Sequence, residues 1–441
     1  MLLTGTVVAD AGTVIDDGAV VVEDDEIAAV GEAERLRETY SDHERRRFDI
    51  VAPGLVGGHI HSVQSLGRGI ADDAALLDWL FEAVLPMEAA MDAEATRAAA
   101  ELGYLECLES GTTTVVDHLS VNHAGEAFEA AIETGIRGRL GKVLMDEASP
   151  DGLLEDTDEA LAESEALIEA YHGAAGGRVR YAVTPRFAVT CSEACLRGCR
   201  DLADRYDGVT IHTHASENED EIERVEAETG KRNVHWLDEV GLTGPDVTLA
   251  HCVHTDERER KVLAETDTVV THCPSSNMKL ASGVAPVHDY LDRGITVALG
   301  NDGPPCNNTL DPFTEMRQAS LLGKVDARDP TRLPAETVLE MATANGARAG
   351  GFDRIGRLTP GYAADVIGIT TERTRATPVH DPISHLVYAA HGDDVVFTMV
   401  DGEVRYDDGA HVGIDAAAVR ARAVRQAERV VAEAGIDAPG S

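Results

Sequence analysis

The stretch IVAPGLVGGHIH, residues 50–61, decides how the rest of the chain is interpreted. It opens with a run of apolar residues that predicts a buried strand, and it ends in His59 and His61. Residues i and i+2 of a strand face the same side, so we expect both imidazoles to point together from its carboxyl end. Two imidazoles placed in this way are half of a metal site.

Other apolar runs along the chain also lead into a residue that can bind a metal ion. These residues are His214, His251, His272 and Asp302, and the runs that precede them are 209–213, 247–250, 268–271 and 296–299. One histidine after a strand is usually a packed core residue. Repetition on five separate strands is not explained by packing, and it predicts a shared site.

The arrangement of these runs predicts the fold. Between residues 54 and 355, strand-like runs alternate with helical stretches rich in Ala, Glu, Leu and Arg, which is typical of a parallel sheet closed as a (β/α)8 TIM barrel. Residues 1–53 and 356–441 carry short strands separated by glycine turns instead. We expect both chain ends to form one small β-sandwich domain beside the barrel, with a polar helix over residues 416–434.

Active-site residues of such barrels lie at the carboxyl ends of the strands, where the histidines and the aspartate are expected. Two or three imidazoles and a carboxylate fit one divalent metal ion, with zinc favoured over iron and a position left for water. A metal ion makes hydroxide available near neutral pH. Glu217, three residues after His214, is then placed to transfer protons.

The composition limits the possible partners and the compartment. The chain has 79 acidic and 38 basic residues, a net charge of −41, and only five of the basic residues are Lys. This excess repels nucleic acid and anionic membranes, so neither is expected as a partner. An acidic, lysine-poor composition is typical of cytoplasmic proteins of halophiles. The sequence shows no signal peptide and no run long enough to span a membrane, so we expect a cytoplasmic location.

The seven cysteines are an odd and scattered set, which indicates reduced thiols rather than a disulfide framework. Cys191, Cys195 and Cys199 have the spacing of one helical face. An iron–sulfur cluster is one interpretation of that spacing, and small residues packing inward is the favoured one.

The sequence resembles the amidohydrolase superfamily, and within it the mononuclear aminohydrolase branch. The motifs that carry the resemblance are PGLV leading to HIH (53–61), SGTTT (110–114), HTHASE (212–217), AHC (250–252), HCPSSN (272–277) and GNDG (300–303). They cover nearly the whole chain in order. The metal ligands that the resemblance implies are His59, His61, His214 and Asp302.

The resemblance also implies a mechanism, the hydrolytic deamination of a ring. Glu217 would carry a proton from the water to a ring nitrogen, His251 would contact the water, and Asp302 with His251 would take the second proton. The binuclear hydrolases of the superfamily, which cleave cyclic amides, use a carboxylated lysine on a middle strand. None of the five lysines lies at such a strand end, where this chain has TPR (184–186), which argues against that reaction.

Part of the sequence resembles guanine deaminase. Gln64 and the stretch TPRF (184–187) are similar to residues that hold the purine there, and GKVLMD (141–146) is similar as well. Arg186 and Gln64 offer hydrogen-bond donors to ring nitrogens or to a carbonyl. We therefore expect Gln64, Arg186 and Phe187 to contact the substrate.

Other parts resemble the 5'-deoxyadenosine deaminases and their methylthioadenosine/S-adenosylhomocysteine and triazine hydrolase relatives. These parts are SSNMKLASG (275–283), DGPPCNN (302–308) and residues 311–324. Glu88 matches an acid that binds ribose hydroxyls in nucleoside deaminases, although guanine deaminases also carry an acid there. Glu88 and Glu217 are therefore included among the expected substrate contacts.

We predict a metal-dependent deaminase of a small-molecule purine or nucleoside, with a 5'-modified adenosine as the first substrate and guanine as the second. Triazine hydrolysis at the same site, and a non-catalytic barrel that only binds a ligand, remain alternatives. If the substrate is S-adenosylhomocysteine, Arg137 and Arg139 are candidates to bind its carboxylate. Relatives are commonly dimers or larger, so a homo-oligomer is expected.

Overall fold

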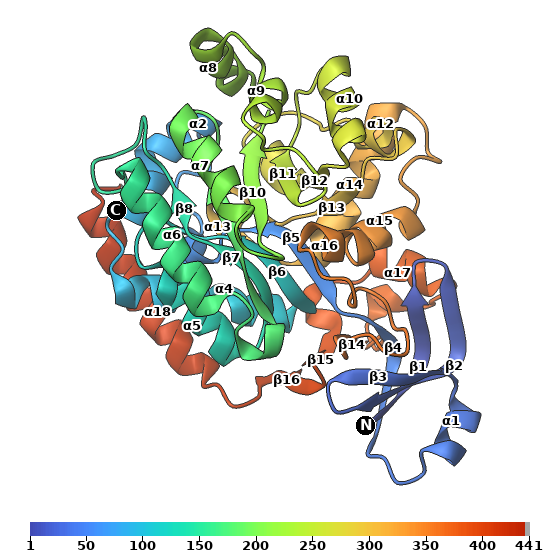
Figure 1. Cartoon of the computed structure of the whole chain (residues 1–441). Coiled ribbons are helices and arrows are strands. Elements are labelled where there is room, and N and C mark those ends of the chain that lie inside the picture. Colours follow the sequence, from blue (N-terminus) through green and yellow to red (C-terminus); the bar gives the residue numbers. More distant parts are fainter. Residues whose placement is uncertain (437–441) are drawn as a thin grey trace.

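The computed structural model describes residues 1–436 and contains two sheets, a parallel barrel and a separate mixed sheet (Figure 1). The barrel strands are β5 (Leu55–Ile60), β6 (Thr112–His118), β7 (Arg137–Gly141), β9 (Val179–Pro185), β10 (Thr210–Ala215), β11 (Val247–His251), β12 (Val269–His272) and β13 (Val297–Leu299). A further two-residue strand, β8 (Val143–Leu144), pairs with β9. All of these pairings are parallel.

The barrel closes between its first and last strands. The order is β13-β12-β11-β10-β9-β7-β6-β5, and the Asp302 amide donates to the His59 carbonyl oxygen at 3.0 Å across the remaining gap. Helices join successive strands on the outside of the barrel (Figure 1). They include α4 (Ala93–Glu109), α5 (Ala124–Thr134), α6 (Thr157–Tyr171), α7 (Glu193–Ala203), α8 (Glu219–Thr229), α9 (Asn233–Glu239), α10 (Glu257–Thr266), α11 (Pro274–Lys279), α12 (Val287–Asp292), α14 (Pro312–Ala327), α15 (Ala335–Met341) and α16 (Ala344–Ala349). The prediction of a TIM barrel is confirmed.

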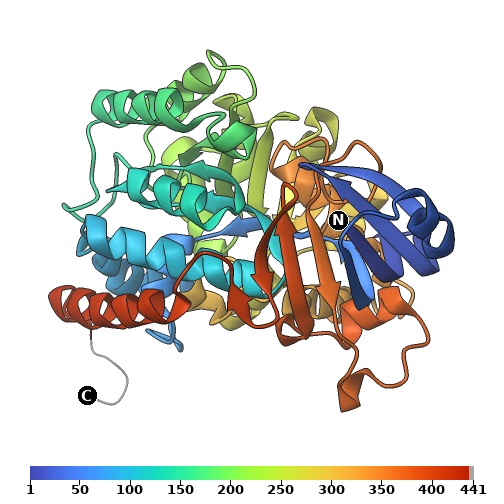
Figure 2. The same cartoon turned by 90° about the horizontal axis from the view of Figure 1, so that it is seen from below.

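Both chain ends meet in the mixed sheet, as predicted. Its strands are β1 (Leu2–Asp10), β2 (Thr13–Glu23), β3 (Glu26–Glu32), β4 (Arg45–Pro53), β14 (Val366–Ile369), β15 (Val395–Val400), β16 (Glu403–Asp407) and β17 (Ala410–His411). They form one sheet in the order β17-β16-β15-β14-β4-β1-β2-β3, so strands from the two ends of the chain lie side by side (Figure 2). β1 pairs with β4 in parallel, and the other pairings of this sheet are antiparallel.

The predicted C-terminal helix is present as α18 (Ala416–Glu433). It packs against the barrel helix α4, away from the mixed sheet that precedes it in sequence (Figure 2). Residues 437–441, which the sequence assigns to the composite region, lie outside the described residues.

The apolar run 50–56 is not one strand, which corrects the expectation for this stretch. β4 ends at Pro53 in the mixed sheet, and β5 begins at Leu55 in the barrel. Gly54 lies between them, where an added Cβ would stand 2.1 Å from the Thr113 hydroxyl oxygen. Only glycine fits such a close approach, so the chain passes from one sheet to the other within one residue.

The cysteines pack inward, as favoured from their spacing. All seven are buried and free, and Cys195 and Cys199 lie on the inner face of α7. Cys191 precedes the helix, and its thiol donates to the Leu144 carbonyl oxygen at 3.2 Å. Between residues 1 and 436, no helix combines the length and the apolar character needed to cross a membrane.

Candidate active site

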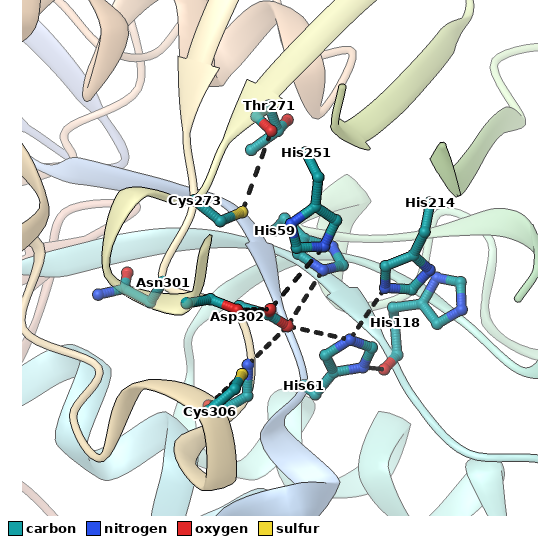
Figure 3. Close-up of polar contacts among 12 residues, drawn as sticks. His59, His61, His118, His214, His251, Thr271, Cys273, Asn301, Asp302 and Cys306 are labelled. Carbon is teal, nitrogen blue, oxygen red and sulfur yellow. Dashed lines mark hydrogen bonds and ion pairs between the residues drawn. The ribbon is translucent and has the colours of Figure 1, made fainter. Parts of the chain in front are cut away.

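Three of the predicted histidines and Asp302 converge at the carboxyl end of the barrel (Figure 3). Nε2 of His59 and Nε2 of His61 lie 3.4 Å and 3.3 Å from the same Asp302 carboxylate oxygen, Oδ1. Nε2 of His61 lies 3.2 Å from Nε2 of His214. One ring nitrogen of each of these three histidines lies within 4.8 Å of the other two, which is close enough for one metal ion to reach them.

Hydrogen bonds on the outer side of the rings orient these histidines. Nδ1 of His61 donates to the His118 carbonyl oxygen and Nδ1 of His214 to the Arg186 carbonyl oxygen, both at 2.6 Å. With the proton on Nδ1, the lone pair of Nε2 faces the centre, as in protein metal sites. Nε2 of His59 is buried and has no hydrogen-bond partner in the described part of the chain. The ring nitrogens of His59, His61 and His214 therefore fit a divalent metal ion as its ligands.

The electrostatics of the centre favour neutral rings beside an ionised carboxylate. Burial lowers the pKa of His59 to about 4 and holds the pKa of His214 well below its usual value. Burial alone would raise the pKa of Asp302, but the nearby imidazoles of His59, His61 and His251 outweigh it and hold that pKa well below the usual range. A neutral imidazole and a carboxylate are the forms that bind metal ions.

The two predicted proton-transfer groups face each other beside this centre. Nε2 of His251 lies 3.5 Å from Glu217 Oε2 and 3.8 Å from Asp302 Oδ2. Burial raises the pKa of Glu217 to about 7. Burial alone would lower the pKa of His251, but the nearby carboxylates of Glu217 and Asp302 outweigh it, and that pKa is raised. A carboxyl group with a pKa near neutrality, such as Glu217, suits acid–base chemistry.

Two neighbouring residues of α11 hold these groups in place, and the sequence analysis assigned them no role. Ser276 Oγ donates to Asp302 Oδ2 at 2.6 Å, which leaves Oδ1 toward the histidines. Asn277 Oδ1 accepts from Nδ1 of His251 at 2.9 Å, so Nε2 of that ring faces Glu217. Both lie in the HCPSSN stretch, shortly after β12 ends. That position in the sequence does not indicate which side chains they contact.

Backbone strain gathers at the same strand ends. Ser216, His251 and Asp302 have φ values of 52°, 70° and 62°, in the left-handed region that residues with a Cβ seldom occupy. Such conformations persist where the surrounding structure enforces them, and they cluster at functional sites. The strained residues therefore lie at the same strand ends as the hydrogen-bonded residues of the site.

Further buried histidines and a cysteine surround the group formed by His59, His61, His214 and Asp302. His212, two residues before His214 on β10, accepts from Nδ1 of His59 through its Nε2 at 3.0 Å. His118, at the end of β6, packs against His214 with ring centroids 4.6 Å apart. Cys273 forms a second possible ligand group with His59 and His251. His272 belongs to neither of the ligand groups found among residues 1–436.

The predicted substrate residues divide into two sets. Arg186 and Phe187 line a pocket above the centre, together with His61, His214, Glu217, His251 and Asp302. Gln64 and Glu88 do not line it. The Glu88 carboxylate is buried and accepts from Gln64 Nε2 at 2.8 Å, from the Ser120 hydroxyl at 2.9 Å and from the Arg186 guanidinium at 3.2 Å.

Arg137 and Arg139 do not reach this pocket, which corrects their suggested role. Both lie on β7, where the Arg137 guanidinium pairs with Asp365 at 2.8 Å. The Arg139 guanidinium donates to the Gly350 and Tyr181 carbonyl oxygens at 2.8 Å and 3.0 Å. The two residues are two positions apart on one strand and therefore face the same side, and both side chains lie away from the pocket. The sequence pattern alone does not indicate this.

Comparisons with known proteins agree with this geometry. A family model described as "Amidohydrolase family" matches residues 50–405, and a shorter one described as "Imidazolonepropionase-like composite domain, bacteria" matches residues 18–40. The chain is 44% identical over 387 residues to a 5-methylthioadenosine/S-adenosylhomocysteine deaminase of Haloarcula marismortui, with 88% of each chain covered. It is also 44% identical over 364 residues to a 5'-deoxyadenosine deaminase of Methanothermobacter thermautotrophicus, with 82% of each covered.

A solved structure resembles the whole molecule. It is an adenosine deaminase from Xanthomonas campestris with bound zinc, and it superposes with a TM-score of 0.90 at 31% identity. The match covers 98% of both chains, so it includes the barrel and the mixed sheet.

Proposed function

This chain belongs to the amidohydrolase family. We propose that it removes the amino group of an aminopurine by hydrolysis, and that its preferred substrate is a 5'-modified adenosine. The products are the inosine analogue and ammonia. The observation that carries the proposal is the convergence of three metal-competent histidines, Asp302 and the Glu217–His251 pair at one end of the barrel, beneath one pocket. The names of the relatives support 5'-deoxyadenosine, methylthioadenosine or S-adenosylhomocysteine as the substrate.

The proposed metal ligands are His59, His61, His214 and Asp302, which would hold one divalent ion. Zinc is favoured over iron because imidazole and carboxylate ligands suit it and because the similar solved structure contains zinc. When bound, such an ion would lower the pKa of a water molecule and so supply the nucleophile near neutral pH.

The protein's own groups move the protons. The water oxygen adds to the ring carbon that bears the amino group while Glu217 takes the water proton and passes it to the adjacent ring nitrogen. The second proton moves through His251 and Asp302 to the amino group, the carbon–nitrogen bond breaks, and ammonia leaves. Glu217 suits both halves of this transfer because its pKa of about 7 lets it accept and donate near neutral pH.

Guanine is the second candidate substrate, and one observation favours it. Glu88 already accepts from Gln64, Ser120 and Arg186, so its carboxylate is not free for the two hydroxyls of a ribose. Arg186 lines the pocket and can donate to a purine carbonyl, which guanine has and adenosine lacks. Gln64 and Glu88 would then act through Arg186 rather than by direct contact.

Ammonia release from a panel of compounds tests these proposals. The panel contains 5'-deoxyadenosine, methylthioadenosine, S-adenosylhomocysteine, guanine and an aminotriazine, each with the zinc-loaded full chain in molar salt. We expect the highest kcat/KM with a 5'-modified adenosine. Release from guanine alone would select the second candidate, and release from the triazine alone would select a triazine hydrolase. Folded, metal-loaded protein that releases no ammonia from any of them would indicate a barrel that only binds a ligand.

We also propose a division into a barrel of residues 54–355 and a composite region of residues 1–53 and 356–441. The passage from β4 to β5 at Gly54 supports the first boundary. The net charge of −41 supports a cytoplasmic, halophilic setting in which salt screens the repulsion between acidic groups. A homo-oligomer is proposed from the habit of relatives, and the molecular mass in solution tests it.

A further inference from the structure

The wall of the pocket beyond the metal centre is apolar. Besides Phe187, it consists of Leu76, Trp79, Leu80 and Leu280, each at most 5% exposed. The first three lie on α2 (Leu76–Trp79) and on the π-helical turn η2 (Leu80–Val84) that continues it. π-helical turns within α-helices are rare and frequently mark functional sites. This wall is where the part of a substrate that lies away from the reacting ring would pack.

The cations near this wall already have partners. Between residues 1 and 436, Arg186 is the single Lys or Arg that lines the pocket, and both its NH1 and its NH2 bond Glu88. Lys279, next to Leu280, binds the Asp72 carboxylate at 2.6 Å and the Pro305 carbonyl oxygen at 2.8 Å. A substrate carboxylate that entered here would have to displace one of these acids.

Trp79 adds the one polar group of the wall. Its side chain is 5% exposed, and its indole Nε1 is buried without a hydrogen-bond partner in the described part of the chain. An unpaired buried N–H is costly, and buried tryptophan N–H groups usually have a partner. A ligand oxygen or nitrogen in the pocket could supply that partner.

We propose that this wall makes Trp79 a substrate-contacting residue and restricts the site to aminopurines whose substituent is uncharged. A 5'-deoxy or methylthio group packs on Leu76, Trp79 and Leu80, and the indole N–H donates to the ligand. S-adenosylhomocysteine is discriminated against because its carboxylate would be desolvated against leucine and tryptophan without a free cation. This inference rests on the proposed function and chooses among its substrates.

The first test compares methylthioadenosine with S-adenosylhomocysteine on the zinc-loaded full chain. We expect kcat/KM to be at least about tenfold higher for methylthioadenosine, the order of effect that a pocket mismatch gives. Equal values, or a preference for S-adenosylhomocysteine, would overturn the inference while leaving the deaminase function intact.

A binding measurement decides the inference even if no compound is turned over. The chain has two tryptophans, so Trp236→Phe, a substitution in the distant helix α9, leaves Trp79 as the single indole reporter. We expect methylthioinosine to change the fluorescence of Trp79 and S-inosylhomocysteine to bind at least tenfold more weakly. No change with either compound at saturation, followed independently by equilibrium dialysis, would refute contact with Trp79.

Two substitutions separate the roles of charge and indole. Leu76→Arg supplies the missing cation, and we expect it to raise the ratio of kcat/KM for S-adenosylhomocysteine over methylthioadenosine, with Leu76→Met as the matched control of similar size. Trp79→Phe keeps an aromatic ring but removes the N–H, and we expect a higher KM for methylthioadenosine with little change in kcat. An unchanged ratio in folded Leu76→Arg, shown by unaltered circular dichroism, would contradict the proposal.

Discussion

The imidazoles at the carboxyl end of the barrel and the arginines of β7 are both buried, but their hydrogen bonding differs. At the carboxyl end, Nε2 of His59 and Nε2 of His251 lack hydrogen-bond partners within the described chain. On β7, away from the pocket, Arg137 pairs with Asp365 and Asp401, and Arg139 donates to carbonyl oxygens. The open ring nitrogens are available to a ligand, whereas the paired guanidinium groups stabilise the fold.

The difference also explains why buried charge alone is a poor guide to function. Arg137 joins β7 of the barrel to Asp365, the residue that precedes β14 of the mixed sheet, so it links the two parts of the molecule. Asp302 is equally buried, but its partners are a hydroxyl, an amide and imidazoles that a metal ion could share. Substitutions in the two sets should therefore affect different properties, namely catalysis and metal binding at the carboxyl end and stability of the fold at β7.

Substituting Asp302→Ala should abolish deamination and metal binding together. Loss of the ion removes several kcal/mol of transition-state stabilisation, which corresponds to roughly 10³- to 10⁴-fold in kcat/KM. Metal content is measured by plasma mass spectrometry beside the rate. A chelator should reproduce the loss in the unsubstituted chain, and added zinc should reverse it there but not in the variant. A variant that keeps its full metal content would remove Asp302 from the ligand set.

Substituting Glu217→Gln should leave the metal in place and lower kcat by about 10²- to 10⁴-fold, because the amide cannot shuttle a proton. The matched control is Glu219→Gln, two residues further on, whose side chain is 80% exposed. We expect that control to keep its rate. Retained turnover in Glu217→Gln would assign proton transfer to another group.

Substituting Asn277→Ala should lower kcat/KM by about 10- to 100-fold, the usual effect of removing a group that orients a site residue. Without the Asn277 oxygen, Nδ1 of His251 loses its acceptor at 2.9 Å and the ring can turn. Metal content should not change, since His251 is not a proposed ligand. The neighbouring, partly exposed Met278→Ala serves as the control, and an equal loss there would point to general disturbance of α11.

The pH dependence should follow the ionisation of Glu217. Its pKa is raised to about 7 by burial, and the ionised form is needed to accept the water proton. kcat/KM should therefore fall about tenfold for each pH unit below 7 and level off above it. A stopped-rate profile between pH 5 and 9 measures this. The acidic limb should disappear in a Glu217→Gln variant that keeps residual activity.

Substituting Arg137→Ala should destabilise the fold and leave the chemistry of the folded protein unchanged. It leaves the buried Asp365 carboxylate without its guanidinium partner, which typically lowers the free energy of unfolding by about 3–5 kcal/mol. The matched control Arg354→Ala breaks an exposed ion pair with Glu26 and should cost less than about 1 kcal/mol. Urea unfolding measures both. A folded Arg137→Ala with a lower kcat would erase the contrast between the imidazoles at the carboxyl end and the arginines of β7.

Much of the fold was predictable because its signals are local. The strands that precede His214, His251 and Asp302 have apolar runs long enough to identify each one without its neighbours. The strand β7 has no such run, because Arg137 and Arg139 interrupt its apolar pattern, and their charges are satisfied by residues far away in sequence. The run 50–56 was assigned to one strand because a pattern of apolar residues does not distinguish two sheets that meet at a glycine.

For the site, the residue types and their place after strands were enough to predict the metal-competent histidines, Asp302 and Glu217. Strand periodicity and the convergence of strand ends are rules that act along the chain. The partners of those residues depend instead on contacts across the barrel. Folding brings Glu88 to Arg186, Asn277 to His251 and Trp79 to the pocket wall, because hydrogen bonding and burial join residues that no sequence spacing relates.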